Sequence, residues 1–300
     1  MDTVLTLHND RLRVDLERPG AAYRRPRYDW PGRGREVVLD GTHRFCQPET
    51  LVPNEGSDGH GLCNEFGIFA PVGYADAAPG DWFPKVGVGW LRRVDGEAYG
   101  FSCEYPVRPG AFGVERDGET AIRMEATVDP ERGYGWRLEK EYRLDGTSLR
   151  TTYRLENTGD LPLRTHEYCH NFVGIDGTPT GPGLALCLGF PLAEDALPTG
   201  LERGADGLIR WPTPVERAYY GMDKAPGRGR NRGWRLLHEP TGVGIAERLE
   251  APLGWTALFG GPHIACTELF VDIDLAPGAS ATWRRVHTCF TAADPVPDVG

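Results

Sequence analysis

Short runs in which apolar and polar residues alternate recur along this chain. Arg11–Leu16 alternates Arg, Leu, Arg, Val, Asp and Leu, the two-residue period of a strand with one buried face. Trp136–Leu144 and Ser148–Glu156 are extended patterns separated by Asp145-Gly146, which is typical of a hairpin. With Leu161–Asn171 as the next strand, this part of the chain predicts a three-stranded meander.

The C-terminal third repeats the same pattern. Its predicted strands are Trp234–Glu239, Gly242–Glu250, Trp255–Phe259, His263–Asp272 and Ala279–Phe290, with Pro/Gly-rich turns between most of them. Short strands at this spacing favour a sandwich or a barrel. We therefore expect an all-β fold, a large antiparallel β-sandwich with few short helices, forming a single domain over residues 1–300.

Three stretches interrupt the strand pattern. They are Gln47–Gly89, Pro191–Pro214 and Ala218–Gly233, the last of which contains the basic run Arg228–Arg232. Long loops in a compact domain often bind ligands, so these stretches are candidate walls of a site. The basic run fits a solvated loop equally well.

Composition and charge exclude several classes of protein. The chain has 40 Gly and 25 Pro, which disfavours long helices, and its 40% hydrophobic residues exclude wholesale disorder. A net charge of −10 argues against nucleic acid as a partner. No stretch approaches the roughly 20 apolar residues of a membrane span, so no membrane is expected. The N-terminus shows no signal peptide and the seven cysteines have no CxxC spacing, which predicts a reducing cytoplasm.

The densest group of ionisable residues lies in Thr165–Phe172. On a strand, His166, Tyr168 and His170 would share one face, and the residues between them, with Asn171, would share the other. Two histidines on one face could be metal ligands, or a general acid and a substrate contact. They could also be hydrogen-bonded structural histidines.

Two further segments carry candidate chemistry. Glu268 lies within the otherwise apolar His263–Val271, where burial should raise its pKa and suit it to general base catalysis. The alternative is an edge-strand glutamate that faces water. Gly59–Gly67 places His60 and Glu65 among glycines that allow a ligand to approach the backbone, although a plain turn is the simpler interpretation.

Together these segments resemble the aldose 1-epimerase (galactose mutarotase-like) superfamily. The resemblance covers most of the chain in order: the hairpin Trp136–Glu156, Asn157–Leu163, His166-Glu167-Tyr168, Cys266-Thr267-Glu268, Leu275–Gly278 and Trp283–Arg285, with His60-Gly61 as a looser match. It implies the family's fold, a large sandwich of antiparallel strands (a galactose mutarotase-like supersandwich).

The resemblance also implies a reaction. In this family a histidine protonates the ring oxygen of a sugar while a glutamate removes the anomeric hydroxyl proton, which interconverts the anomers. Carried over, His166 is the acid and Glu268 is the base. The residues expected to bind sugar hydroxyls are His60, Glu65, Lys85, His170 and Asn171, with Trp82 and Trp90 as stacking surfaces. The expected partner is a small sugar or glycoside, with no cofactor, and a homodimer is a candidate assembly.

Two alternatives use the same fold. His166, His170 and Glu65, with His60 as a further candidate, could bind one divalent metal ion, and Glu268 would then be the base of a lyase, an isomerase or a C-glycoside-cleaving enzyme. In the other alternative the chain is a non-catalytic carbohydrate-binding protein that uses the same groove.

Overall fold

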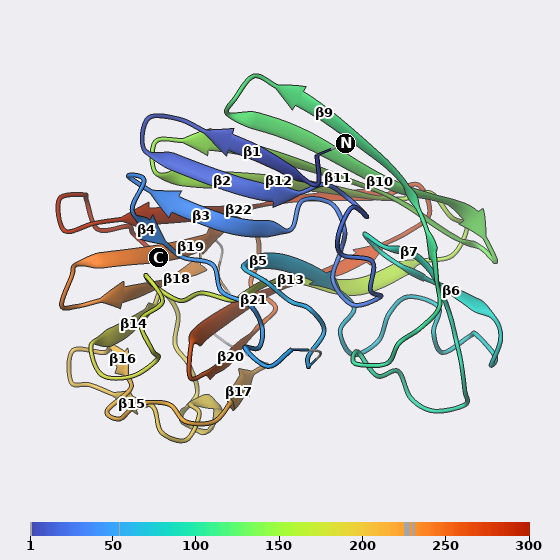
Figure 1. Cartoon of the computed structure of the whole chain (residues 1–300). Helices are drawn as coiled ribbons and strands as arrows, with labels where there is room; N and C mark the ends of the chain where they lie inside the picture. Colours follow the sequence, from blue (N-terminus) through green and yellow to red (C-terminus); the bar gives the residue numbers. More distant parts are fainter. Residues whose placement is uncertain (1, 54, 225–228, 230–231) are drawn as a thin grey trace.

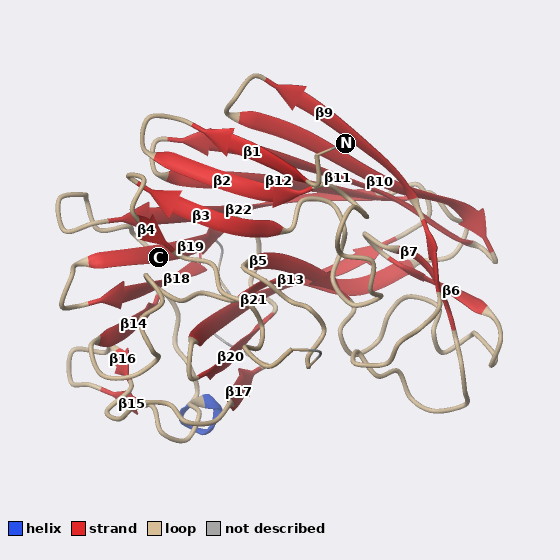
Figure 2. Cartoon of the chain, viewed as in Figure 1, coloured by secondary structure: helices blue, strands red, loops and turns tan. Residues whose placement is uncertain are grey.

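The computed structural model describes residues 2–53, 55–224, 229 and 232–300. This part of the chain forms 22 strands and a single 3-10 turn, η1 (Glu194–Ala196). Figure 2 shows that strands and connecting loops account for nearly everything else. The all-β expectation is confirmed, and among the described residues no helix is long and apolar enough to cross a membrane.

The strands form two large antiparallel sheets and a small third one. The nine-stranded sheet runs in the order β1 (Val4–His8), β2 (Leu12–Glu17), β3 (Gly34–Leu39), β5 (Leu62–Phe66), β13 (Leu163–Asn171), β21 (Ile264–Leu275), β20 (Trp255–Gly261), β17 (Tyr219–Asp223), with β4 (His43–Arg44) also paired to β3. The three-stranded sheet is β6 (Trp82–Lys85), β7 (Gly89–Arg92) and β8 (Val107–Pro109).

The ten-stranded sheet draws on the middle and the end of the chain. Its order is β15 (Glu202–Arg203), β16 (Ile209–Arg210), β14 (Leu184–Leu188), β18 (Arg232–His238), β19 (Val243–Leu249), β22 (Ser280–Phe290), β12 (Ser148–Asn157), β11 (Tyr134–Asp145), β10 (Ala121–Glu131), β9 (Ala111–Asp117). All five strands predicted in the C-terminal third are present within a few residues. They are β18, β19 and β22 in this sheet and β20 and β21 in the nine-stranded sheet.

The two large sheets pack against each other as the layers of a sandwich (Figure 1). One continuous apolar cluster joins them, with Leu7 and Cys169 from the nine-stranded sheet and Ile122, Trp136 and Trp283 from the ten-stranded sheet. Each of these side chains is at least 97% buried. Removing this much apolar surface from water is the main driving force for the sandwich.

The predicted three-stranded meander is only partly correct. β11 and β12 form the expected hairpin, but β13 leaves their sheet and pairs with β21 and β5 instead. The buried side chain of Asn157 stabilises this crossing, because it accepts the Gly159 N–H and donates to the carbonyls of Leu161 and Leu275. A polar turn thus carries the chain from one layer to the other, and β13 becomes a central strand.

Each of the three stretches predicted as loops contains at least one strand. Gln47–Gly89 contains β5, whose five residues are all buried, and β6. Pro191–Pro214 contains η1, β15 and β16. Arg228, Arg230 and Asn231 of the predicted basic run lie outside the described residues.

Candidate functional site

β13 has two chemically different faces, as its alternation predicts. Glu167 and Asn171 point into the sandwich, where their partners lie on strands of the ten-stranded sheet. His166, Tyr168 and His170 occupy the opposite face, which packs against aromatic side chains and loops. The candidate site lies on this second face.

A buried carboxylate is the centre of one group on this face. Glu65 lies opposite Tyr168 in the β5–β13 register and accepts a hydrogen bond of 2.7 Å from its hydroxyl. Arg27 Nε donates to the same carboxylate at 3.0 Å, and Lys85 Nζ donates at 3.1 Å. Burial raises the pKa of Glu65, but the charges of Lys85 and Arg27 outweigh it and hold the pKa below its usual value. Glu65 is therefore ionised, and its carboxylate holds the side chains of Arg27, Lys85 and Tyr168 in place.

Arg27 is a residue that the sequence analysis missed. It comes from the loop between β2 and β3, and Nη1 also donates to Glu49 at 3.1 Å and to Ser57 at 3.3 Å. The ring of Phe101 lies 4.5 Å from its guanidinium carbon. A basic segment around residue 27 is visible in the sequence, but nothing in that segment indicates which arginine turns inward.

His170 and Glu268 form the second group, which we call the proton-transfer pair. Nδ1 of His170 lies 3.2 Å from Oε1 of Glu268, without the alignment of a hydrogen bond. Their side chains keep 6% and 5% of their surface exposed. Burial raises the pKa of Glu268 to about 8, although Arg27 opposes the shift. Burial, and then Arg27, lowers the pKa of His170 well below its usual value.

These shifts give the folding stability a predictable pH dependence. The carboxyl of Glu268 holds its proton more tightly in the folded state, so its contribution to stability is present below about pH 4.5 and is lost as the pH rises to about 8. We expect the unfolding free energy of the wild type to fall over this interval relative to that of Glu268→Gln. Urea unfolding of both proteins at several pH values measures the difference. Parallel profiles would contradict the raised pKa.

The structure does not bring His166 to Glu268. In the β13–β21 register His166 lies opposite Asp272, roughly 13 Å along the strand from the level of His170. Its ring packs near Trp255 and Phe270, and burial and then Lys85 lower its pKa to about 4. The expectation was that His166 would be the acid and Glu268 the base, but the histidine in contact with Glu268 is His170.

Two of the expected sugar-binding residues lie elsewhere. The side-chain amide of Asn171 is fully buried inside the sandwich and donates to Glu247 at 2.8 Å. The charged neighbours of His60 are Arg35, Arg33 and Glu17, and burial, followed by Arg35, lowers its pKa to about 4. Lys85, Glu65 and His170 remain on the face of the candidate site.

Trp82 and Trp90, the residues expected to stack on the sugar, both contact an arginine instead. The guanidinium of Arg108 lies 4.8 Å from the ring of Trp82 and 5.5 Å from that of Trp90. Trp90 is buried in the core. Three aromatic side chains on this side of the sheet are exposed instead: Phe101, Tyr220 and Phe69, at 39%, 54% and 49%.

Two of these exposed rings lie beside the polar groups, and the third lies beside His166. Phe101 covers Arg27, and the burial of Tyr220, followed by the charge of Glu268, raises the pKa of Tyr220 to about 12. The ring of Phe69 lies 6.2 Å from that of His166 and lines an adjoining groove of about 910 Å³. Exposed rings beside hydrogen-bonding groups suit a ligand with both apolar and polar faces.

The residues proposed as metal ligands do not gather. Across residues 2–53, 55–224, 229 and 232–300, no group of three or more His, Cys, Asp or Glu side chains has the arrangement of a metal site. Both carboxylate oxygens of Glu65 already accept hydrogen bonds from cations. The donor set of His166, His170 and Glu65 therefore does not fit a divalent ion.

Solved structures identify the class of fold. The sandwich with β13 and β21 at the centre of one sheet is the galactose mutarotase-like fold, as expected from the sequence. A galactose mutarotase related enzyme from Lactobacillus acidophilus matches with a TM-score of 0.57 and 12% identity, over 98% of this chain and 99% of that one.

Two further solved structures agree. A galactose mutarotase-like protein from Lactobacillus casei matches with a TM-score of 0.56 and 12% identity, over 96% of this chain and 100% of that one. Another galactose mutarotase-like protein, from Clostridium acetobutylicum, matches with a TM-score of 0.57 and 10% identity, over 96% of this chain and 94% of that one. No protein-family model and no curated protein matches the chain. At these identities the likeness establishes the fold.

Proposed function

We propose that this protein is a carbohydrate-active isomerase of the aldose 1-epimerase type, in which the proton-transfer pair interconverts sugar anomers. The observation that carries the proposal is the 3.2 Å contact between His170 and Glu268, with Arg27 and the exposed rings of Phe101 and Tyr220 nearby. The galactose mutarotase-like fold supports the same reaction class.

The protonation of the pair matches what anomer exchange requires. Burial disfavours both the carboxylate and the imidazolium, so near neutral pH the pair holds one dissociable proton, which resides on Glu268. Glu268 gives this proton to the ring oxygen while His170 accepts the proton of the anomeric hydroxyl, and the ring opens to the aldehyde. After rotation about the bond to the carbonyl carbon, both transfers reverse and the ring closes as either anomer. No proton is gained or lost overall, and each transfer contributes about 10²–10⁴-fold.

The other residues on this face bind and orient the sugar. Nη2 of Arg27 has no hydrogen-bond partner among the described residues, which leaves it free for a sugar hydroxyl. Glu65 and Lys85 hold each other in place and so fix the position of this guanidinium. Tyr220 and Phe101 provide flat apolar surfaces for the faces of a sugar ring.

Anomer equilibration tests the proposal. Single anomers of a panel of aldoses, including sugar phosphates, are followed by polarimetry and by NMR with and without the protein. At least one sugar should equilibrate faster than in buffer. Binding without acceleration across the panel would instead support a carbohydrate-binding protein that uses the same face.

A further inference from the structure

The hydrogen-bond ladder between β13 and β21 is interrupted at the proton-transfer pair. Regular pairing ends at Tyr168 and Phe270, and it resumes where the N–H of Ala265 donates to the carbonyl of Val173 at 2.9 Å. Both contacts follow one register, so neither strand gains or loses a residue in between. The pair therefore lies within a local opening between two strands that remain aligned.

The side chain of Asn171 occupies this opening from the interior of the sandwich. Its Nδ2 lies 2.8 Å from the carbonyl oxygen of Thr267 on β21 and 3.2 Å from that of Cys169 on β13. A side-chain amide thus joins the two strands where their backbone pairing is absent. The residues on either side of the contact, His170 and Glu268, point to the opposite face.

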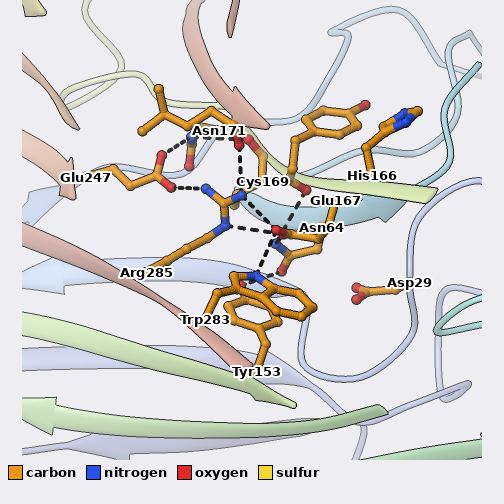
Figure 3. A network of polar contacts seen from close by, with 12 residues as sticks. Asp29, Asn64, Tyr153, His166, Glu167, Cys169, Asn171, Glu247, Trp283 and Arg285 are labelled. Atoms are coloured by element: carbon orange, nitrogen blue, oxygen red, sulfur yellow. Dashed lines mark hydrogen bonds and ion pairs between the residues drawn. The ribbon is translucent and has the colours of Figure 1, made fainter. Parts of the chain in front are cut away.

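Asn171 is itself held by a buried charged network (Figure 3). Glu247 accepts from its Nδ2 at 2.8 Å, and the ring of His287 contacts its Oδ1 at 3.0 Å. Arg285, which is fully buried, bonds to Glu247 and Glu167.

Arg285 also acts on the opened strand directly. Its Nη2 donates to the carbonyl of Leu269 at 2.8 Å, next to Glu268 in the chain. Asn171 donates to the carbonyl of Thr267 in the same way. The backbone carbonyls on both sides of Glu268 therefore have hydrogen-bond donors. Satisfied buried carbonyls keep a fixed position, since breaking either bond leaves a polar group without a partner.

We propose that Asn171 is a positioning residue that holds β13 and β21 open, so that His170 and Glu268 lie in contact on the far face. The role in catalysis rests on the proposed function, but the geometric role does not. Loss of the amide would leave the Thr267 carbonyl unsatisfied, and the strands would shift to satisfy it or water would enter. Either change moves the two side chains of the pair relative to each other.

The test compares Asn171→Leu with Asn157→Leu in the full chain. Asn157 is the matched control, because its buried amide also donates to a β21 carbonyl, that of Leu275, at the other end of the strand. The first readout is the titration of the Glu268 carboxyl followed by carbon-13 NMR, which needs no substrate. The second is the separation of kcat from KM in anomer equilibration.

We expect Asn171→Leu to move the Glu268 titration midpoint by about one pH unit or more, and Asn157→Leu to leave it in place. With an active protein, kcat should fall about tenfold to a hundredfold with KM nearly unchanged. An unmoved midpoint in a folded Asn171→Leu protein would overturn the proposal. If that variant does not fold, Asn171→Ala takes its place, because it also removes the amide that contacts the Thr267 carbonyl, and an unmoved midpoint there would overturn the proposal as well. A shifted midpoint without anomerase activity would uphold the positioning role and refute the proposed function alone.

Discussion

Replacing Glu268 by Gln should lower the rate of anomer equilibration by about 10²–10⁴-fold while the protein stays folded. The amide keeps the size of the side chain but has no dissociable proton, so the pair loses its acid in ring opening and its base in ring closure. Polarimetry of a single anomer under saturating sugar measures kcat directly.

Glu115→Gln is the control for this substitution. Glu115 lies on β9 with its side chain 77% exposed, and its ion pair with Arg123 is 3.9 Å long. Its removal should leave the rate as it is. A Glu268→Gln protein with the wild-type rate would show that Glu268 takes no part in proton transfer.

The largest loss of stability should follow from Arg285→Met. Arg285 is the cation that Glu167 and Glu247 share, and all three side chains are fully buried. Removing the cation leaves two buried carboxylates without their charge partner, which costs about 3–5 kcal/mol. Urea unfolding monitored by tryptophan fluorescence measures this difference.

The next residue in the chain provides a matched control. Arg284 points to the other face of β22, where its side chain is 45% exposed and pairs with Glu250. Arg284→Met should change the unfolding free energy by no more than about 0.5 kcal/mol. Equal effects of the two substitutions would mean that the buried network contributes little to stability.

The strands and their faces could be predicted from the sequence because they depend on local patterns. The alternation in Thr165–Phe172 correctly placed His166 and His170 on one face, and the apolar neighbours of Glu268 correctly indicated its raised pKa. Both inferences need only the two-residue period of a strand and the cost of burying a charge.

The pairing across the sheet could not be predicted in the same way. Which histidine lies beside Glu268 depends on the register of two strands about a hundred residues apart in sequence, and no local pattern specifies it. The short match of His166-Glu167-Tyr168 to a family motif therefore indicated His166, whereas the histidine in contact with Glu268 is His170. Arg27 was missed for a related reason, since only the folded loop brings it to Glu65.

The central claim is that His170, and not His166, transfers protons together with Glu268. Anomer exchange measured by NMR for His170→Ala and His166→Ala, on a sugar that the wild type equilibrates, tests it most directly. We predict that His170→Ala loses about 10²-fold or more in kcat and that His166→Ala retains a kcat near that of the wild type. The reverse result, with His166→Ala inactive and His170→Ala active, would contradict the account.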